Sequence, residues 1–356
     1  MDNMFKKLLD ESKENYLKKS KNFNEKTSVL LVNEQEIEEI KKFAKDNSLN
    51  FDIIYTKCDI VSIEALIEKY KNQVHYFITN GVVSNKIYNC FVENGVIEEN
   101  IYVGPTRNSY VDLYDKRDVI YENIDKINEV YNSLEDSKSK RIFLRIITRL
   151  CLPYQFHYYY EYEDFPQYYP EDFKFSEEEV YLDAGTCDGQ NVFEFLEAVN
   201  GKYKYIYAFE ADSNNYKLCK DKLKKINNLE LINGALYSEH GYLSFLSSTK
   251  TGKKGNAHVF PDGDEKIESF SGDDLKFSPT YIKMDIEGSE KNALLGLQKT
   301  IKETSPKLAI CIYHFQKDFW EVPLLIKQIN PDYKLKIRNH ENMYCLLESV
   351  CYAYRG

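Results

Sequence analysis

The sequence predicts an α/β protein: a mostly parallel sheet with a final antiparallel strand in the second half of the chain, preceded by a smaller α/β domain. Short apolar segments alternate with amphipathic ones along much of the 356 residues, which is typical of parallel sheets covered by helices. One such segment, VYLDA, runs into a glycine turn and then into a helical pattern. Near the C-terminus, residues 333–338 and 349–354 are separated by about ten residues, a spacing that permits an antiparallel pair.

Composition limits the classes of function. The length favours two domains, and 43% hydrophobic with 29% charged residues is ordinary for a globular protein. A net charge of −10 argues against nucleic acid as the main partner, because phosphate binding needs a concentrated basic surface. The eight cysteines form no CxxC pair, so they indicate neither a zinc site nor a disulfide framework. With a charged N-terminus and no apolar run of the roughly 20 residues that span a membrane, we expect a cytoplasmic protein.

Residues 1–128 are predicted to form an accessory α/β domain. After a polar helical arm, strand-like segments alternate with helical ones, at 28–32, 34–47, 51–55, 63–70, 74–79, 86–94 and 101–103. No glycine-rich phosphate loop accompanies them. We therefore expect this domain to serve docking or substrate selection, with a vestigial nucleotide or sugar site as the alternative.

Residues 129–178 are expected to connect the two domains. Residues 127–152 carry one long helical pattern, which Pro153 ends. The aromatic-rich stretch 154–173 follows. Two interpretations are open: these side chains pack between the domains, or they form a wall that faces the substrate.

Residues 179–356 contain the segment that is most informative about chemistry. In it a strand runs through Asp183 into a turn bracketed by Gly185 and Gly189, and a helix over 191–199 follows. A dinucleotide-binding turn has the spacing Gly-x-Gly-x-x-Gly, whereas here an acid precedes Gly-x-x-x-Gly. Carboxylates at Asp183 and Asp188 would repel a pyrophosphate, but they suit a sulfonium ligand without phosphate. S-adenosylmethionine is such a ligand. The alternative is a turn whose glycines serve backbone geometry alone. The residues expected to contact the cofactor here are Asp183, Ala184, Gly185, Thr186, Cys187, Asp188 and Gly189.

The next strand, residues 205–210, ends in an acid 27 positions after Asp183. In a crossover of this kind the acid at the tip of the second strand accepts hydrogen bonds from ribose hydroxyls, so Glu210 is the predicted ribose ligand, with Ala211 beside it. A helix over 214–226 and a strand over 229–233 lead to Ala235, where a small residue leaves room for adenine. A surface glutamate and a plain turn are the alternatives. Beyond a strand at 242–245, residues 247–266 are expected to be a mobile loop.

A second group of polar residues follows the strands at 281–285 and 307–313. Asp285, Glu287 and Glu290 lie at the exit of the first strand and His314 at the exit of the second, at the carboxyl edge of a parallel sheet where ligands bind. We expect His314 to be the general base, with Asp285 or Glu287 orienting it or the substrate, and Asp285 also to contact the cofactor. A structural histidine is the alternative. We expect no metal; Mg²⁺ held by Asp285 and Glu287 against vicinal hydroxyls is the alternative.

The motifs LDAGTCDG, AFEAD, YIKMDIEGSE and PKLAICIYH, followed by IRNH, resemble the FkbM family of S-adenosylmethionine-dependent methyltransferases over residues 130–354. The resemblance implies a class I methyltransferase domain with a Rossmann-like sheet and S-adenosylmethionine as cofactor. It further implies O-methylation of a sugar or glycan-linked group, as in a surface polysaccharide or flagellin glycan. The turn is more polar than in many relatives, which leaves the role of Cys187 open; next to a helix N-terminus, its thiol is expected to be somewhat acidic.

Several alternatives remain at this point. The acceptor is a small molecule or a glycan, and it could be a glycan-linked amine rather than a hydroxyl. An NAD-dependent dehydrogenase shares the sheet and the ribose acid but lacks the expected glycine spacing. A non-catalytic scaffold of a glycan-modifying complex would carry a degenerate pocket. Two kinds of protein partner are also considered. The chain forms a homo-oligomer, or it binds a glycan-modification partner through residues 1–128.

Overall fold

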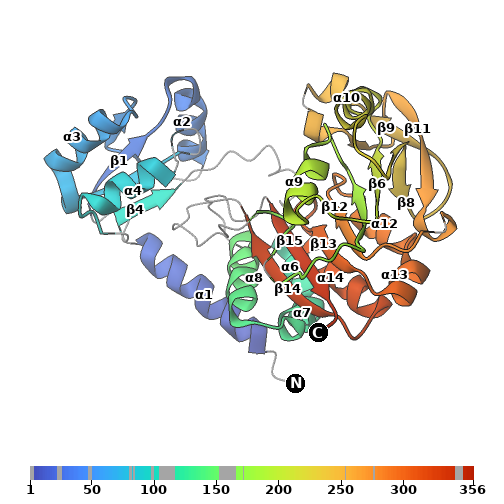
Figure 1. Ribbon diagram of the computed structural model, residues 1–356. Coiled ribbons are helices and arrows are strands. Elements are labelled where there is room, and N and C mark those ends of the chain that lie inside the picture. The colour runs from blue at the N-terminus through green and yellow to red at the C-terminus, as the bar shows by residue number, and fades with distance from the viewer. Residues whose placement is uncertain are drawn as a thin grey trace. The chain divides into compact units, whose positions relative to one another are not determined.

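The computed structural model describes most of the chain and divides it into two compact units (Figure 1). The described residues are 4–21, 26–46, 50–79, 82, 85–97, 100–103, 117–151, 166–170, 172–252, 254–275, 277–340 and 348–356. The first unit comprises Met1–Asn128, Phe143–Tyr162 and Glu341–Leu346. The second comprises Glu129–Ile142, Glu163–His340 and Leu347–Gly356.

The first unit contains a parallel four-stranded sheet with the order β2-β1-β3-β4. The strands are β1 (Thr27–Leu31), β2 (Ile53–Tyr55), β3 (Val74–Ile78) and β4 (Ile101–Val103). The helices from the first part of the chain are α1 (Met4–Lys21), α2 (Ile37–Asp46), α3 (Ile60–Tyr70), α4 (Asn85–Glu93) and α6 (Arg117–Glu122). The predicted smaller α/β region is confirmed. In the part of the chain that the structure describes, no helix combines the length and apolarity that a membrane crossing requires.

Alternation along β1 explains how helices cover both faces of this sheet. Val29 and Leu31 belong to a buried cluster that includes residues of α3 and α4. Leu30, with Val32 beyond the strand, belongs to a second cluster that includes Ile40 of α2. Successive side chains of a strand point to opposite faces, so this apolar segment supplies both cores.

The single helix predicted over residues 127–152 is wrong. The structure has α7 (Ile124–Ser133) and α8 (Ser137–Leu150), separated by a short extended segment. There the backbone N–H of Glu135 donates to the carbonyl of Leu335 at 2.9 Å. The Asp136 carboxylate then accepts from the N–H of Ser139 at 2.7 Å, which caps the start of α8. Pairing with a distant strand and a new helix cap thus override the local helical pattern.

The second unit is built on a seven-stranded sheet with the order β14-β15-β13-β12-β5-β6-β7. Its strands are β5 (Val180–Ala184), β6 (Tyr205–Glu210), β7 (Leu229–Asn233), β12 (Tyr281–Met284), β13 (Lys307–Cys311), β14 (Lys334–Asn339) and β15 (Ser349–Tyr354). Only β15 runs against its neighbours β13 and β14. The predicted mostly parallel sheet with a final antiparallel strand is confirmed. Strand order reverses between β5 and β12, and open α/β sheets bind ligands at such a point.

Helices connect these strands. They are α9 (Gln190–Ala198), α10 (Ser213–Leu223), α12 (Glu290–Leu295), α13 (Gln298–Thr304) and α14 (Asp318–Ile329). A five-residue turn joins β5 to α9 and a two-residue turn joins β6 to α10, so the N-termini of both helices lie at the ligand-binding edge of the sheet.

A second, four-stranded sheet with the order β10-β9-β11-β8 was not predicted. It consists of β8 (Ala235–Tyr237), β9 (Gly241–Leu246), β10 (His258–Val259) and β11 (Glu265–Ser271), with the short helix α11 (Ser248–Thr251) after β9. The interpretation of residues 247–266 as a loop is therefore wrong for α11, β10 and the start of β11. Strands of two and three residues are too short to leave a periodic signal in the sequence.

Part of the aromatic-rich segment lies in the core of the second unit. Tyr168, Tyr169 and Phe173 are buried, and the rings of the last two lie 6.2 and 5.9 Å from the ring of Tyr281. Residues 154–165 of this segment lie outside the described residues. The side chains at 168, 169 and 173 therefore act as core residues of the second unit, and the hydroxyls of Tyr168 and Tyr169 also donate to residues of the site described below.

Candidate active site

The glycine turn between β5 and α9 depends on backbone geometry that glycine alone allows. Gly185 has a φ of 83°, and a Cβ there would lie 1.9 Å from the carbonyl oxygen of Asp285. Its N–H donates to the carbonyl of Phe209 at 3.1 Å, which ties the turn to β6. Gly189, with a φ of 86°, donates to the carbonyl of Thr186 at 2.8 Å. The two glycines thus let the chain turn tightly between two strands and enter the helix.

Beneath this turn lies a fully buried ion pair. The Lys283 ammonium is 3.2 Å from the Asp183 carboxylate, and both side chains have zero exposure. Lys283 also donates to the carbonyl of Gly185 at 2.8 Å. Burial alone would favour a neutral lysine, but the carboxylates of Asp183 and Asp285 raise the pKa of Lys283 above its ordinary value. The lysine therefore stays charged and fixes the turn from below.

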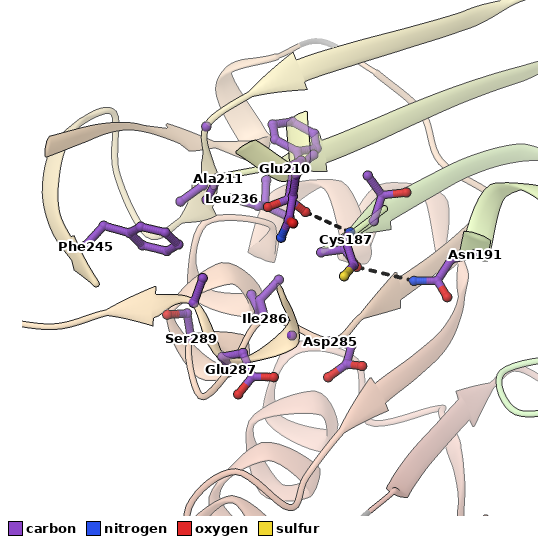
Figure 2. Close-up of a pocket in the computed structure, with 18 of the residues that line it drawn as sticks. Cys187, Asn191, Glu210, Ala211, Leu236, Phe245, Asp285, Ile286, Glu287 and Ser289 are labelled. Atoms are coloured by element: carbon purple, nitrogen blue, oxygen red, sulfur yellow. Dashed lines mark hydrogen bonds between the residues drawn. The ribbon is translucent and has the colours of Figure 1, made fainter. Parts of the chain in front are cut away.

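A pocket of about 320 Å³ opens at this edge of the sheet (Figure 2). Many residues expected to contact the cofactor or substrate line it: Gly185, Thr186, Cys187, Asp188, Glu210, Ala211, Ala235, Asp285 and Glu287. Asp183, Ala184, Gly189 and His314 are not among the lining residues. Asp183 acts on the turn through Lys283, and a direct contact between it and a cofactor stays a prediction.

Glu210 stands at one end of the pocket, held by backbone amides. It is 6% exposed and accepts hydrogen bonds from the N–H groups of Cys187 at 2.7 Å and Asp212 at 2.9 Å. Burial raises the pKa of Glu210 to about 8 despite these hydrogen bonds. Asp212 caps α10 and also accepts from the N–H of Ser248 at 2.8 Å, which ties α11 to this end of the pocket.

The expected acidity of the Cys187 thiol is wrong. Burial, together with the nearby carboxylates of Glu210 and Asp188, raises the pKa of Cys187 to about 11. Desolvation and negative neighbours outweigh the helix N-terminus. The negative charge ascribed to the turn is also offset, because Asp188 pairs with Lys222 at 2.8 Å and Asp183 pairs with Lys283.

The apolar part of the pocket comes from the second sheet, which sequence reasoning missed. Leu236 of β8, Phe245 of β9 and Val259 of β10 line the pocket together with Ala257. Figure 2 shows the Phe245 ring opposite Glu210 and Ala211. Apolar residues at alternate positions 243 and 245 are the signal that indicated β9, but nothing local to the chain showed that its partner strands would complete a wall.

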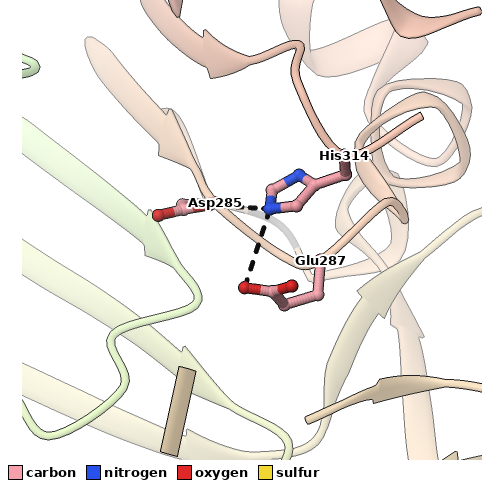
Figure 3. Close-up of side chains that lie close together, drawn as sticks. All are labelled: Asp285, Glu287 and His314. Atoms are coloured by element: carbon pink, nitrogen blue, oxygen red, sulfur yellow. Dashed lines mark ion pairs between the residues drawn. The ribbon is translucent and has the colours of Figure 1, made fainter. Parts of the chain in front are cut away.

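At the other end of the pocket, Asp285, Glu287 and His314 lie together (Figure 3). The Nε2 atom of His314 is 3.4 Å from Asp285 Oδ1 and 3.6 Å from Glu287 Oε1. Its Nδ1 atom is 3.1 Å from Glu290 Oε1. The parallel topology therefore brings together the three predicted catalytic side chains, as expected for residues at the carboxyl ends of β12 and β13.

Two tyrosines, one of them from the aromatic-rich segment, hold Asp285. The hydroxyl of Tyr168 donates to Asp285 Oδ2 at 3.0 Å, and that of Tyr313 donates to Asp285 Oδ1 at 3.3 Å. Burial disfavours the ionised acid, but Lys283 and His314 hold the pKa of Asp285 below its ordinary value. Asp285 is therefore an ionised, oriented carboxylate at the pocket wall.

The protonation state of His314 bears on its expected role. Burial alone would disfavour the imidazolium, but the carboxylates of Glu290 and Glu287 raise the pKa of His314 well above its ordinary value. In the site without ligands the ring thus carries both protons near neutral pH. A ring in that state cannot accept a proton, so a role for His314 as general base requires a ligand that displaces one proton.

Comparisons with known proteins agree with this fold. Residues 183–349 match the family model described as the Methyltransferase FkbM domain. The solved methyltransferase FkbM from Methylobacillus flagellatus KT is 20% identical, covers 94% of this chain and 92% of its own, and has a TM-score of 0.62. A fibrillarin from Aeropyrum pernix, solved with natively bound S-adenosyl-L-methionine, is 8% identical over 50% of this chain and 66% of its own, with a TM-score of 0.32. No curated protein matches the chain at a significant level.

The sheet order and the family match define an enzyme of the S-adenosylmethionine-dependent methyltransferase class. Within that class, residues 183–349 match the FkbM methyltransferase domain, so the predicted resemblance to this family is confirmed.

Proposed function

We propose that the chain transfers a methyl group from S-adenosylmethionine to a hydroxyl of a sugar or glycan-linked group. One observation carries this proposal. A single pocket runs from Glu210, an acid placed to accept hydrogen bonds, to Asp285 and Glu287 at its other end. Such a pocket can hold a nucleoside at one end and a polar acceptor at the other.

The cofactor is proposed to lie across the glycine turn. Its ribose hydroxyls would donate to Glu210, and its adenine would lie against Leu236 and Phe245. The pocket volume of about 320 Å³ is within the range of small-molecule sites, which are mostly apolar with a few placed polar groups. The sulfonium would then lie toward Asp285, whose ionised carboxylate favours a positive charge.

Methyl transfer itself needs positioning more than covalent participation by the protein. The acceptor oxygen forms a bond to the methyl carbon as the carbon–sulfur bond breaks. The electron pair of that bond goes to sulfur, which leaves as the neutral thioether, and the hydroxyl proton passes to a nearby carboxylate or to water. Charge is neutralised as the reaction proceeds, so a pocket that excludes water favours the transition state.

The acceptor is proposed to bind at Asp285 and Glu287. Two carboxylates near one another can accept hydrogen bonds from vicinal hydroxyls, which sugars present. His314 contacts both acids from a position that is 3% exposed, so it would act on the acceptor largely through them. The cytoplasmic location and a partner or second copy bound through residues 1–128 stay predictions.

Calorimetric titration with S-adenosylmethionine, and with NAD⁺ in parallel, tests the cofactor. We expect one S-adenosylmethionine per chain and no heat from NAD⁺; the reverse result would overturn the proposal.

For the reaction, mass spectrometry of surface polysaccharide and flagellin from a deletion strain should reveal a missing increment of about 14 Da, the mass of one added methylene. Complementation with His314→Ala should lower methylation at least about tenfold, because Asp285 and Glu287 lose the side chain that holds them at the acceptor end.

A further inference from the structure

We propose that Asp285, Glu287 and His314 form a binding site for a divalent first-row transition-metal ion such as Mn²⁺ or Zn²⁺. This replaces the expectation from sequence that the site holds no metal. The role of the ion in methyl transfer rests on the proposed function, whereas the site itself rests on the geometry of the three side chains.

The spacing of the donor atoms fits one shared ion. One ligand atom from each residue can be chosen so that all three lie within 4.8 Å of one another. His314 Nε2 lies 3.4 and 3.6 Å from the two carboxylate oxygens, which is long for a charged hydrogen bond. Ligands about 2.0–2.1 Å from a tetrahedral ion lie about 3.3–3.4 Å apart, so small shifts would allow all three atoms to coordinate it.

The histidine provides a second, independent observation. His314 is 3% exposed, and among the described residues its Nε2 atom has no hydrogen-bond partner. That atom points between Asp285 and Glu287 (Figure 3). A buried ring nitrogen without a hydrogen bond costs free energy unless a ligand satisfies it, and a metal ion between the two carboxylates would do so.

On the other side of the ring, His314 Nδ1 also has no hydrogen bond of good geometry among the described residues, but a carboxylate lies within ion-pair distance of it. Glu290 Oε1 lies 3.1 Å from His314 Nδ1, and Glu290 is itself 1% exposed and accepts from the N–H of Ile286 at 2.9 Å. A carboxylate on the far ring nitrogen fixes the tautomer and the ring orientation of a metal ligand. Glu290 is thus a positioning residue on the side of the ring away from Nε2, the atom that would coordinate the ion.

The donor set and its place in the pocket define the kind of ion. One imidazole with two carboxylates suits Mn²⁺ or Zn²⁺ better than Mg²⁺, which prefers oxygen ligands alone. Asp285 and Glu287 line the pocket whereas His314 does not, so protein ligands would occupy one side of the ion and leave positions open toward the acceptor. An ion there could bind an acceptor hydroxyl and lower its pKa.

Titration of the full chain with Mn²⁺, with any purification tag removed, tests the site through the electron paramagnetic resonance signal of the free ion. We expect one Mn²⁺ per chain, displaced by Zn²⁺ but not by the same concentration of Mg²⁺. Binding should weaken at least about tenfold in Glu287→Gln and stay unchanged in Glu303→Gln, a matched change on the exposed side of α13. Pulsed measurements should detect an imidazole nitrogen bound to Mn²⁺. If Glu287→Gln fails to fold, Asp285→Asn takes its place.

The outcomes separate this inference from the proposed function. Absence of saturable Mn²⁺ binding, absence of nitrogen coupling, or equal affinity in both glutamine variants would overturn the metal site. Displacement by Mg²⁺ as effective as that by Zn²⁺ would overturn it too, because it would show that carboxylates alone bind the ion. S-adenosylmethionine affinity is measured on the same samples. Cofactor binding without Mn²⁺ leaves the proposed function standing, and Mn²⁺ binding without the cofactor leaves the metal site standing.

Discussion

Two carboxylates at the two ends of one pocket respond oppositely to similar surroundings. Glu210 is the last residue of β6 and Asp285 follows β12, and burial disfavours ionisation at both positions. Burial raises the pKa of Glu210 to about 8, and the Asp212 carboxylate adds to the rise, whereas hydrogen bonds from backbone amides only partly offset it. The pKa of Asp285 falls, because Lys283 and His314 stabilise its negative charge. Burial acts in the same direction on both acids, so the cationic partners that the fold supplies at Asp285 and not at Glu210 account for the difference between the two ends.

This difference divides the chemistry between the two ends. A carboxyl group that titrates near neutral pH can exchange amide hydrogen bonds for those of an incoming ligand at a modest electrostatic cost. An ionised carboxylate that two tyrosines and two cations hold in place can attract a positive group and orient an acceptor. Pairs of acids with divergent pKa values are a common feature of enzyme sites, and here the pair spans the length of the pocket.

Gly185 contacts both β6, which ends in Glu210, and the backbone of Asp285, so it joins the two ends of the pocket. Its replacement should have the largest effect. In Gly185→Ala the new Cβ would lie 1.9 Å from the carbonyl oxygen of Asp285 and would also require a positive φ. We expect the free energy of unfolding in urea to fall by about 3–5 kcal/mol, and S-adenosylmethionine binding to weaken more than about 100-fold.

Gly201→Ala is the matched control. Gly201 also has a positive φ, 72°, but nothing lies within 4 Å of its Cβ position. It should lose only about 1 kcal/mol of stability, the usual cost of the left-handed conformation, and keep its cofactor affinity. Equal losses in the two variants would show that backbone strain, rather than the contact between the two ends, dominates at Gly185.

Glu210→Gln should separate stability from binding. Removing a buried group whose ionised form is disfavoured should raise the free energy of unfolding at pH 8, whereas losing the charged acceptor should weaken S-adenosylmethionine binding by about 10- to 100-fold. Chemical denaturation and calorimetry on the same protein measure both quantities. Glu230→Gln, at an exposed position of β7, should change neither. Weaker binding accompanied by lower stability would contradict the roles assigned to Glu210.

Sequence reasoning succeeded where the signal was local to one strand and its exit. The turn after β5, the acid at the end of β6 and the residues that follow β12 and β13 each come directly after a recognisable apolar segment. Once the strands are taken as parallel, their carboxyl ends must meet at one edge, so the proximity of Asp285 and His314 followed from topology alone.

What sequence reasoning missed depends on contacts between distant segments. The Tyr168 hydroxyl reaches Asp285 from 117 positions away. The pairing of Lys283 with Asp183 follows from strand register, in which Lys283 lies directly beside Asp183. A lysine within an otherwise apolar strand was a usable signal of a buried ion pair. The break between α7 and α8 and the strands β8 and β10 had no such signal, because each depends on a partner strand elsewhere in the chain.

The pH dependence of cofactor binding should sharpen the same comparison. Between about pH 4.5 and 8 the folded, ligand-free protein holds the Glu210 proton more tightly than the unfolded chain, so this group makes stability fall as pH rises through that window. Ribose hydroxyls bind the ionised form, so affinity for S-adenosylmethionine should rise about 20-fold from pH 6 to 7.5 and level off only above pH 8, where the free carboxyl group becomes mostly ionised. Calorimetry in two buffers of different ionisation enthalpy should show proton release. Glu210→Gln should abolish both effects; a wild-type affinity independent of pH would rule out Glu210 as the titrating ligand.

The smallest effect is expected at Cys187, which lies between the two ends and contributes through its backbone. Its N–H donates to Glu210, whereas the pKa of its thiol is raised to about 11, so the side chain stays neutral and unreactive near pH 7. Cys187→Ala keeps the backbone N–H, and alanine, like cysteine, has a Cβ at this position, where φ is 55°. Cofactor affinity should therefore change less than about threefold. Alkylation of the wild-type thiol should be slow at pH 7. At pH 9, where Glu210 is mostly ionised, it should be faster in Glu210→Gln than in the wild type, because a neutral amide does not oppose the thiolate. A large loss of affinity in Cys187→Ala would mean that the sulfur itself contacts the ligand, and that the polarity of this turn reflects binding by side chains as well as by the backbone.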